Sequence, residues 1–445
     1  MRRLAIVLVS VVALSGCWTQ RGFDAGNSGS SPLPTSIIPA NVGTLAHRFT
    51  ATNPGTSGLH AVVSGGTLFA VGDRLYAFDA RGCSGTAPTS CTPIWQSGDT
   101  GGFGQDIVVG GGKVWVTRQT GNPVDVRGYD PTGAGCPTPT TCAPVTTFTT
   151  PRAVPSQLRW IGDTLSVRDW VGAYGSAPAH HYLYAYDASG TLRWQADLGT
   201  ADSIYAPSIA VADGDTVFAR LPLGPPLAFD NRAITNCAGT PKTCQPMWSY
   251  AGGGIVAARA GKLYAVGNDA ISVFDALGVN GCSGTPKVCA PVWSTPFGTR
   301  APVAVTSNRL YAGINGGFTA AFALDGSGCS GSPVVCQPRW TNVRGAAGTP
   351  ITTGSSEAGG VVYTISHVCA DPSCSTTSSW YVDAHDASGT VGCTGAPKVC
   401  SSLWSQALPF KPNEVMVVGD VVYVVGEARN LFSDPAPTIW GFRTS

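Results

Sequence analysis

Residues 66–79 read GTLFAVGDRLYAFD, and this stretch decides the fold. It holds two short, mainly apolar runs, 67–71 and 75–79, joined by the turn residues Gly72 and Asp73. Short apolar runs with polar turn residues between them are typical of β-hairpins. A turn followed by such a run occurs eight times, in Gly66–Val71, Gly112–Thr117, Asp163–Arg168, Asp215–Arg220, Gly261–Val266, Asn308–Gly313, Gly360–Ile365 and Asp420–Val425. The chain is therefore predicted to be a β-repeat protein.

Each copy extends into a unit of four expected strands. A short apolar run precedes it, as at 61–63 and 415–418, and a third run follows, which ends in Asp in seven copies. These aspartates are Asp79, Asp130, Asp187, Asp230, Asp275, Asp325 and Asp386, and a fourth run carries Trp95, Trp194, Trp248, Trp293, Trp340 and Trp404 in six copies. Four strands at intervals of about 45 to 60 residues are the repeat of a propeller blade. The predicted fold is an all-β, eight-bladed β-propeller of four-stranded antiparallel blades.

The eighth repeat stops after its third strand, at 439–443, which leaves one outer strand missing. An open sheet edge is unfavourable, because its backbone groups stay unpaired. The run 45–49, LAHRF, precedes the first repeat and is the natural donor. We therefore expect an N-terminal strand to close the ring, with residues 41–445 forming one cooperative propeller domain.

The N-terminus has the pattern of an export signal. Arg2 and Arg3 precede an apolar stretch from Leu4 to Leu14. This stretch is too short to span a bilayer, because a membrane-spanning helix needs about 20 apolar residues. The stretch ends in Leu-Ser-Gly-Cys17, which resembles the lipobox of bacterial lipoproteins. We expect a lipoprotein signal peptide at 1–16, a lipidated Cys17 that anchors the protein to the outside of the cell membrane, and a lead-in segment at 17–40. The alternative is an ordinary signal peptide with a cysteine nearby.

The cysteine count agrees with export. Of 15 cysteines, Cys17 is set aside by the lipobox, and the other fourteen fall into close pairs. The pairs are Cys83 with Cys91, Cys136 with Cys142, Cys237 with Cys244, Cys282 with Cys289, Cys329 with Cys336, Cys369 with Cys374, and Cys393 with Cys400. We predict disulfides within these pairs, which is typical of an oxidising compartment. Zinc binding is the alternative, although most spacings are wider than those of zinc sites and histidine is scarce.

Charge excludes one class of partner. The chain has 27 basic and 26 acidic residues, so it lacks the basic excess typical of nucleic-acid-binding proteins. No nucleic-acid partner is expected.

The Tyr-Ala-Phe-Asp repeats with their following Trp resemble pyrroloquinoline-quinone-like (PQQ-like) propeller repeats. Residues 20–45 also resemble the lead-in of quinoprotein dehydrogenases. The resemblance implies that each of the six tryptophans packs against the neighbouring blade. It is specific for the fold and not for the function, because this propeller serves enzymes as well as non-catalytic lipoproteins.

The ligands that quinoproteins use cannot be placed on this sequence. No two cysteines are adjacent, and the only glutamates are Glu357, Glu414 and Glu427. The repeated aspartates are interpreted as turn residues that accept backbone N–H bonds. His180 and His181 would point to opposite sides of a strand, and a surface-loop position is favoured for them. We predict no catalytic residue, no metal and no cofactor.

The expected function is that of a membrane-tethered, non-catalytic scaffold that binds a protein or cell-envelope ligand, similar in layout to the outer-membrane assembly lipoprotein of this fold. A PQQ-dependent dehydrogenase or a carbohydrate-active propeller enzyme are the alternatives. Binding is expected on the face that carries the connections between second and third strands, which are long at 119–126, 169–181, 366–379 and 427–438. Candidate binding residues are Trp170, Tyr174, His180 and His181; neutral loop growth is the other explanation.

Overall fold

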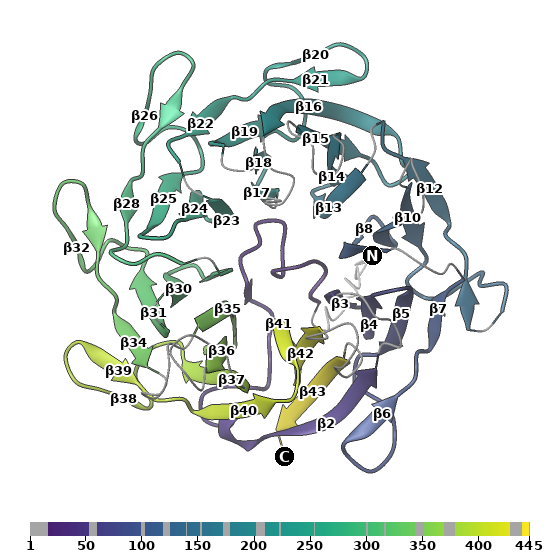
Figure 1. Ribbon diagram of the computed structural model, residues 1–445, viewed down its shortest axis with the longest axis vertical. Helices are drawn as coiled ribbons and strands as arrows, with labels where there is room; N and C mark the ends of the chain where they lie inside the picture. Colours follow the sequence, from purple (N-terminus) through teal and green to yellow (C-terminus); the bar gives the residue numbers. More distant parts are fainter. Residues whose placement is uncertain are drawn as a thin grey trace, which may run out of the picture.

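The computed structural model describes residues 17–444 apart from 53–59, 99–102, 119–124, 139, 152–153, 172–178, 202–209, 222–223, 253, 300, 316, 344–350, 369–378 and 428–437. Eight β-sheets stand around a central axis and form a closed ring (Figure 1). The predicted eight-bladed propeller is confirmed. The only helix in the described residues is the 3₁₀ turn η1 (Val42–Thr44), and none of the described helices could cross a bilayer.

The blades are numbered in chain order, and their strands are given from the ring centre outward. Blade 1 contains β3 (His60–Ser64), β4 (Thr67–Val71), β5 (Leu75–Asp79) and β7 (Trp95–Ser97), and blade 2 contains β8 (Phe103–Gly110), β9 (Lys113–Arg118), β10 (Asp125–Tyr129) and β12 (Thr146–Thr149). Blade 3 contains β13 (Val154–Ile161), β14 (Thr164–Val171), β15 (Ala179–Tyr186) and β16 (Leu192–Ala201), and blade 4 contains β17 (Val211–Asp213), β18 (Thr216–Arg220), β19 (Pro226–Asp230) and β22 (Trp248–Tyr250). Blade 5 contains β23 (Gly254–Arg259), β24 (Lys262–Val266), β25 (Ile271–Asp275) and β28 (Trp293–Ser294), and blade 6 contains β29 (Ala304–Val305), β30 (Arg309–Ile314), β31 (Phe318–Ala323) and β34 (Trp340–Val343). Blade 7 contains β35 (Ile351–Ala358), β36 (Val361–Val368), β37 (Ser379–Asp386) and β40 (Trp404–Leu408), and blade 8 contains β41 (Lys411–Val418), β42 (Val421–Glu427), β43 (Thr438–Thr444) and β2 (Leu45–Thr52).

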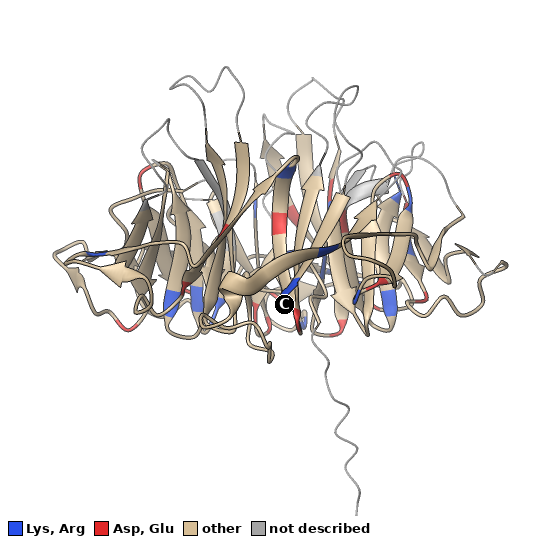
Figure 2. Ribbon diagram, turned by 90° about the horizontal axis from the view of Figure 1, so that it is seen from below, with Lys and Arg blue, Asp and Glu red and all other residues tan. Residues whose placement is uncertain are grey.

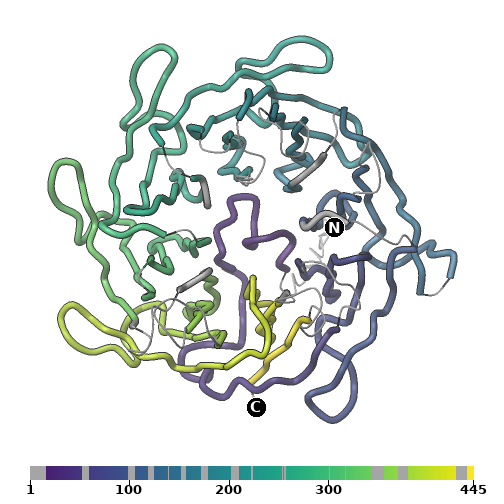
Figure 3. The backbone as a smooth tube through the Cα atoms, in the orientation of Figure 1, coloured from purple at the N-terminus to yellow at the C-terminus, as the bar shows by residue number. Residues whose placement is uncertain are grey.

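The two ends of the chain close the ring together. Strand β2 pairs antiparallel with β43, from Leu45 opposite Thr444 to Thr52 opposite Thr438. Figure 3 shows the purple N-terminal segment running beside the yellow C-terminal one at this blade. The N-terminal strand therefore supplies the outer strand that the eighth repeat lacks, as predicted.

The core lies between neighbouring blades, because each blade buries apolar side chains on both faces. The tryptophan of an outer strand packs on the turn after the third strand of the next blade. A Cβ atom added to Gly389 in that turn would lie 2.3 Å from the Trp340 ring, so the turn needs glycine at its φ of +68°. The indole N–H groups of Trp194 and Trp340 donate to Asn231 O at 2.9 Å and to Ala387 O at 3.3 Å across the blade interface.

The cysteine pairs form small hairpins on the rim of the ring, and six of the seven predicted disulfides are present: Cys83–Cys91, Cys136–Cys142, Cys237–Cys244, Cys282–Cys289, Cys329–Cys336 and Cys393–Cys400. The hairpin strands are β6 (Thr89–Cys91), β11 (Thr141–Cys142), β20 (Cys237–Ala238), β21 (Lys242–Cys244), β26 (Cys282–Ser283), β27 (Val288–Cys289), β32 (Cys329–Ser330), β33 (Val335–Cys336), β38 (Cys393–Thr394) and β39 (Lys398–Cys400). Each hairpin adds a strand to the preceding blade rather than to its own.

The seventh predicted disulfide differs from the other six in its place in the chain. It would join Cys369 to Cys374 in the connection between β36 and β37, and not in a rim hairpin. Both Cys369 and Cys374 lie outside the described residues. The disulfide between Cys369 and Cys374 therefore stays a prediction.

The ring has two faces, which Figure 2 shows edge-on. We call the face with the turns between first and second strands the turn face, and the one with the connections between second and third strands the loop face. Two of the predicted long connections are shorter than expected. Strand β14 continues to Val171 and β15 begins at Ala179, while β36 continues to Val368 and β37 begins at Ser379, because these segments keep pairing as strands.

Candidate functional site at the ring centre

Residues 18–31, which we call the N-terminal plug, cross the middle of the ring as the purple segment in Figure 1. Its last two residues form β1 (Ser30–Ser31), which pairs parallel with β35. The innermost strand or edge of every blade makes a hydrogen bond to the plug. In order around the ring these bonds are Val63 N to Trp18 O (2.8 Å), Val109 N to Thr19 O (2.7 Å), Trp160 N to Gln20 Oε1 (3.0 Å), Ala212 N to Ala25 O (2.8 Å), Ala258 N to Gly26 O (2.7 Å), Val305 N to Ser28 O (2.6 Å), Glu357 N to Gly29 O (2.8 Å) and Gly22 N to Glu414 Oε1 (3.4 Å).

The sequence of the plug suits this narrow space. A Cβ atom on Gly26 would lie 1.9 Å from Ala258 O, so only glycine lets the backbone approach blade 5 this closely. Asp24 accepts bonds from the N–H and Oγ of Ser28 at 2.9 and 2.7 Å, which fixes the turn between them. Trp18 is fully buried and packs edge-on against Phe23 at 5.2 Å.

Charged side chains hold the plug against blades 5 to 7. Arg259 Nη1 donates to Ser28 Oγ at 3.0 Å and to Ser30 O at 3.2 Å, and it lies 3.9 Å from Asp24 Oδ2. Ser30 Oγ donates to Glu357 Oε2 at 2.7 Å. Burial raises the pKa of both carboxyl groups above their ordinary values, against the lowering effect of these hydrogen bonds and of Arg259.

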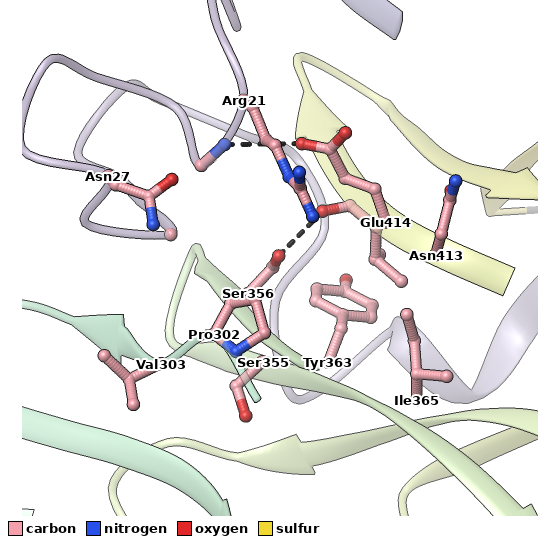
Figure 4. A pocket seen from close by; sticks show the side chains of 13 residues that line it. Arg21, Asn27, Pro302, Val303, Ser355, Ser356, Tyr363, Ile365, Asn413 and Glu414 are labelled. Carbon is pink, nitrogen blue, oxygen red and sulfur yellow. Dashed lines mark hydrogen bonds between the residues drawn. The ribbon is translucent and has the colours of Figure 1, made fainter. Parts of the chain in front are cut away.

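A small cavity lies between the plug and blades 6 to 8 (Figure 4). Arg21 and Asn27 line it from the plug, Tyr363 from β36, and Glu414 from β41. Burial raises the pKa of Glu414 to about 7, although Arg21, the Gly22 N–H group and Trp18 favour its charged form. The cavity therefore contains a carboxyl group that changes charge near neutral pH.

Blades 1 to 3 place a second group of buried polar side chains beside the plug. Arg159 is 1% exposed; its Nη1 donates to Leu158 O at 3.1 Å, and its Nη2 lies 3.5 Å from Asn27 Oδ1. Asp106 is also buried, and its carboxylate favours the charged form of Arg159. Burial, followed by the charges of Arg21 and Arg159, lowers the pKa of His60 to about 3, so this imidazole is neutral.

The PQQ-like resemblance implies a quinone with a calcium ion at the ring centre, and the described residues do not fit that pair. Calcium requires several oxygen ligands that converge on one point. The part of the chain that the structure describes contains no group of three or more His, Cys, Asp or Glu side chains that could hold a metal ion. Glu414 is the only carboxylate among the residues lining the cavity, and it already accepts the Gly22 N–H.

Three of the four candidate binding residues lie together at the loop-face end of blade 3. Trp170 pairs with His181 across β14 and β15, and His180 is next to His181. Tyr174 lies outside the described residues. The expected surface-loop position of the histidines is wrong, because both belong to β15; His180 Nε2 lies 2.6 Å from Asp197 Oδ1, whereas His181 is buried beside Arg168.

Cys17 is not disulfide-bonded and lies at the turn face. The next residue, Trp18, forms an isolated β-bridge with Val63, just before the first turn of blade 1.

Sequence reasoning missed the plug, because Gly22, Gly26, Gly29 and their polar neighbours have the composition of a linker. The crowded glycines and the buried Trp18 are the residues that could have indicated it.

Comparison with known proteins shows the fold. No family model and no curated protein matches the sequence. Among solved structures, the computationally designed Ika8 protein superposes with a TM-score of 0.57 at 11% identity over 89% of this chain and 99% of its own. A europium-containing methanol dehydrogenase gives 0.52 at 12% identity over 96% and 98%, and BamB from Moraxella catarrhalis gives 0.51 at 11% over 90% and 97%. At such identities the likeness concerns architecture, and the chain has the fold of an eight-bladed β-propeller.

Proposed function

We propose that this protein is a membrane-tethered, extracytoplasmic scaffold that binds a protein or cell-envelope ligand and carries out no chemistry at its ring centre. The plug is the observation that carries the proposal. It crosses the ring centre, where the PQQ-like resemblance implies that a quinoprotein holds its cofactor, and all eight blades bond to it. Fold alone does not choose between the functions, since a methanol dehydrogenase shares it.

The position of Cys17 supports the orientation of the scaffold. Six disulfides are typical of an oxidising compartment outside the cytoplasm. In our proposal Cys17 is acylated, which places the turn face toward the membrane. The loop face, with Trp170 and His180 at the end of blade 3, then points away from the membrane toward a partner. Long connections on a rigid scaffold are common recognition surfaces.

Site-specific photo-crosslinking in intact cells tests this orientation. A photoreactive phenylalanine at position 170 is expected to yield a crosslinked species in the membrane fraction. The same group at Arg81, an exposed residue near the turn face, is expected to yield no such species. A Cys17→Ala variant should leave the membrane fraction. Crosslinks from position 81 alone, or membrane association that survives Cys17→Ala, would contradict the proposal.

A further inference from the structure

Six of the eight blades have the outer edge of their outermost strand covered by a hairpin of the following blade. The added strand always runs parallel to the edge that it covers. The covered pairs are β2 with β6, β7 with β11, β16 with β21, β22 with β27, β28 with β33 and β34 with β39. These hairpins therefore cover sheet edges as well as holding a disulfide.

Blades 1 and 4 use the same two backbone donors to bind the added strand. In blade 1, the N–H groups of Gln96 and Gly98 donate to Thr140 O and Cys142 O, both at 2.9 Å. In blade 4, the N–H groups of Ser249 and Ala251 donate to Lys287 O and Cys289 O, both at 3.0 Å. The first and third residues after the repeated Trp position thus point their N–H groups outward.

Blade 2 offers the same two donors without a hairpin against them. Thr146 faces Gly128 in β10 as Trp95 faces Ala77 in β5, so Thr147 and Thr149 take the outward positions. Both side chains are exposed. The following blade has only the short turn 187–191 where six other blades carry a hairpin. In the described part of the chain, no strand pairs with this edge.

The uncovered edge of blade 7 is different, because the chain packs against it. The helix η1 contacts β40, and a Cβ atom added to Gly43 in η1 would lie 3.3 Å from Leu403 O, just before that strand. Blade 2 has an open groove beside β12 instead, which Lys113 and Ala188 help to line. Lys113 Nζ donates to Ala188 O at 2.9 Å and stands 5.5 Å from the Trp115 ring centroid. In blade 5, the hairpin residue Lys287 makes the corresponding kind of bond, to Gly278 O at 3.0 Å.

We propose that the outer edge of blade 2, Thr146–Thr149, is a docking site for an extended segment of a partner protein, which adds as a parallel strand. Exposed sheet edges bind peptides in this manner, with main-chain bonds for affinity and side-chain positions for specificity. The two carbonyl groups of the segment accept from the N–H groups of Thr147 and Thr149.

The covered blades indicate which side chains the segment carries. Opposite Gln96 and Ser249 stand the β-branched residues Thr141 and Val288. The next residue of each hairpin, Cys142 or Cys289, is buried against the blade. The partner segment therefore presents a β-branched residue opposite Thr147 and a small apolar residue opposite Phe148. This site is on the rim, so it is separate from the loop face of the proposed function.

The probe is a synthetic, disulfide-closed peptide with the sequence of residues 281–290, GCSGTPKVCA. Backbone amide hydrogen exchange is measured in the purified protein with and without the peptide. In the free protein, the amides of Thr147 and Thr149 are expected to exchange faster than those of Gln96 and Gly98. Saturating peptide should slow the first pair by about tenfold and leave the second pair unchanged.

Two variants make the test specific. A graft that replaces residues 188–193 with residues 276–292 gives blade 3 its own hairpin, which should slow exchange at Thr147 without peptide and prevent any further effect of peptide. Thr147→Pro removes one donor from an edge position and should abolish protection of Thr149. The proposal would be overturned if the peptide left exchange at Thr147 and Thr149 unchanged. It would also be overturned if the peptide slowed exchange at these residues in the grafted protein as much as in the unaltered protein. Neither result bears on crosslinking from position 170.

Discussion

Glu414 carries the pH dependence that the ring centre is expected to show. It is 8% exposed and lies against the plug with Arg21 and Arg159, which both favour its charged form. Burial has the larger effect and raises its pKa from an ordinary value of 4.5 to about 7. A group whose pKa is raised by folding contributes stability that is complete below the unfolded pKa and is lost as the pH rises through the folded pKa.

Relative to the unaltered protein, the Glu414→Gln variant is therefore expected to have a larger free energy of unfolding at pH 8 than at pH 5. The gain over the unaltered protein, measured by denaturant unfolding at both pH values, should be larger at pH 8 by up to about 3 kcal/mol. His60 titrates with the opposite sign, because its pKa is lowered to about 3, but both proteins contain it and its effect cancels in the difference. The same difference at pH 5 and pH 8 would show that Glu414 is not protonated by burial.

Single residues were predictable where their partners are near in sequence. Each repeated aspartate accepts an N–H bond from two residues further on, as Asp79 does from Arg81 at 2.8 Å and Asp325 from Ser327 at 2.9 Å. Glu414 was not predictable in this way, because its bond to Gly22 spans 392 residues. No local pattern in the sequence records such a contact.

At the scale of elements, the hairpins combine a predictable feature with an unpredictable one. The close cysteine spacing predicts a disulfide loop, as between Cys282 and Cys289. The addition of that loop to the preceding blade was not predicted, because a parallel pair as short as Ser249–Tyr250 with Val288–Cys289 leaves no periodic signal. The hairpins therefore cover the edge of the neighbouring sheet in addition to holding a disulfide.

A double variant, Cys282→Ser with Cys289→Ser, tests this edge-covering role. Without the disulfide, the hairpin is expected to leave the edge of β22 more often, so the amides of Ser249 and Ala251 should exchange faster. Unfolding should cost less free energy by up to about 2–3 kcal/mol, the loop-closure limit for so small a ring. The amides of Gln96 and Gly98, covered by another hairpin, serve as the control. If the double variant and the unaltered protein exchange at the same rates at all four positions, the hairpin covers the edge without its disulfide.

At the scale of the whole molecule, closure of the ring was predictable and the filling of its centre was not. A repeat that lacks one strand requires a donor, and the run 45–49 was the available one. The plug contributes only the two-residue strand β1 and is otherwise held by a few separate hydrogen bonds to each blade rather than by continuous strand pairing. Its glycines and polar residues are equally compatible with a linker, so the ring around it is what defines its conformation.

The chain fills its own ring centre with the plug, and we propose that it carries out no quinone chemistry there. Reconstitution of the purified protein with pyrroloquinoline quinone and calcium, followed by dye reduction with alcohols and sugars, tests it most directly. We expect dye reduction no faster than in quinone and calcium alone, because the plug fills the ring centre and Glu414 already accepts the Gly22 N–H group. Substrate turnover that requires both the protein and the quinone would contradict it.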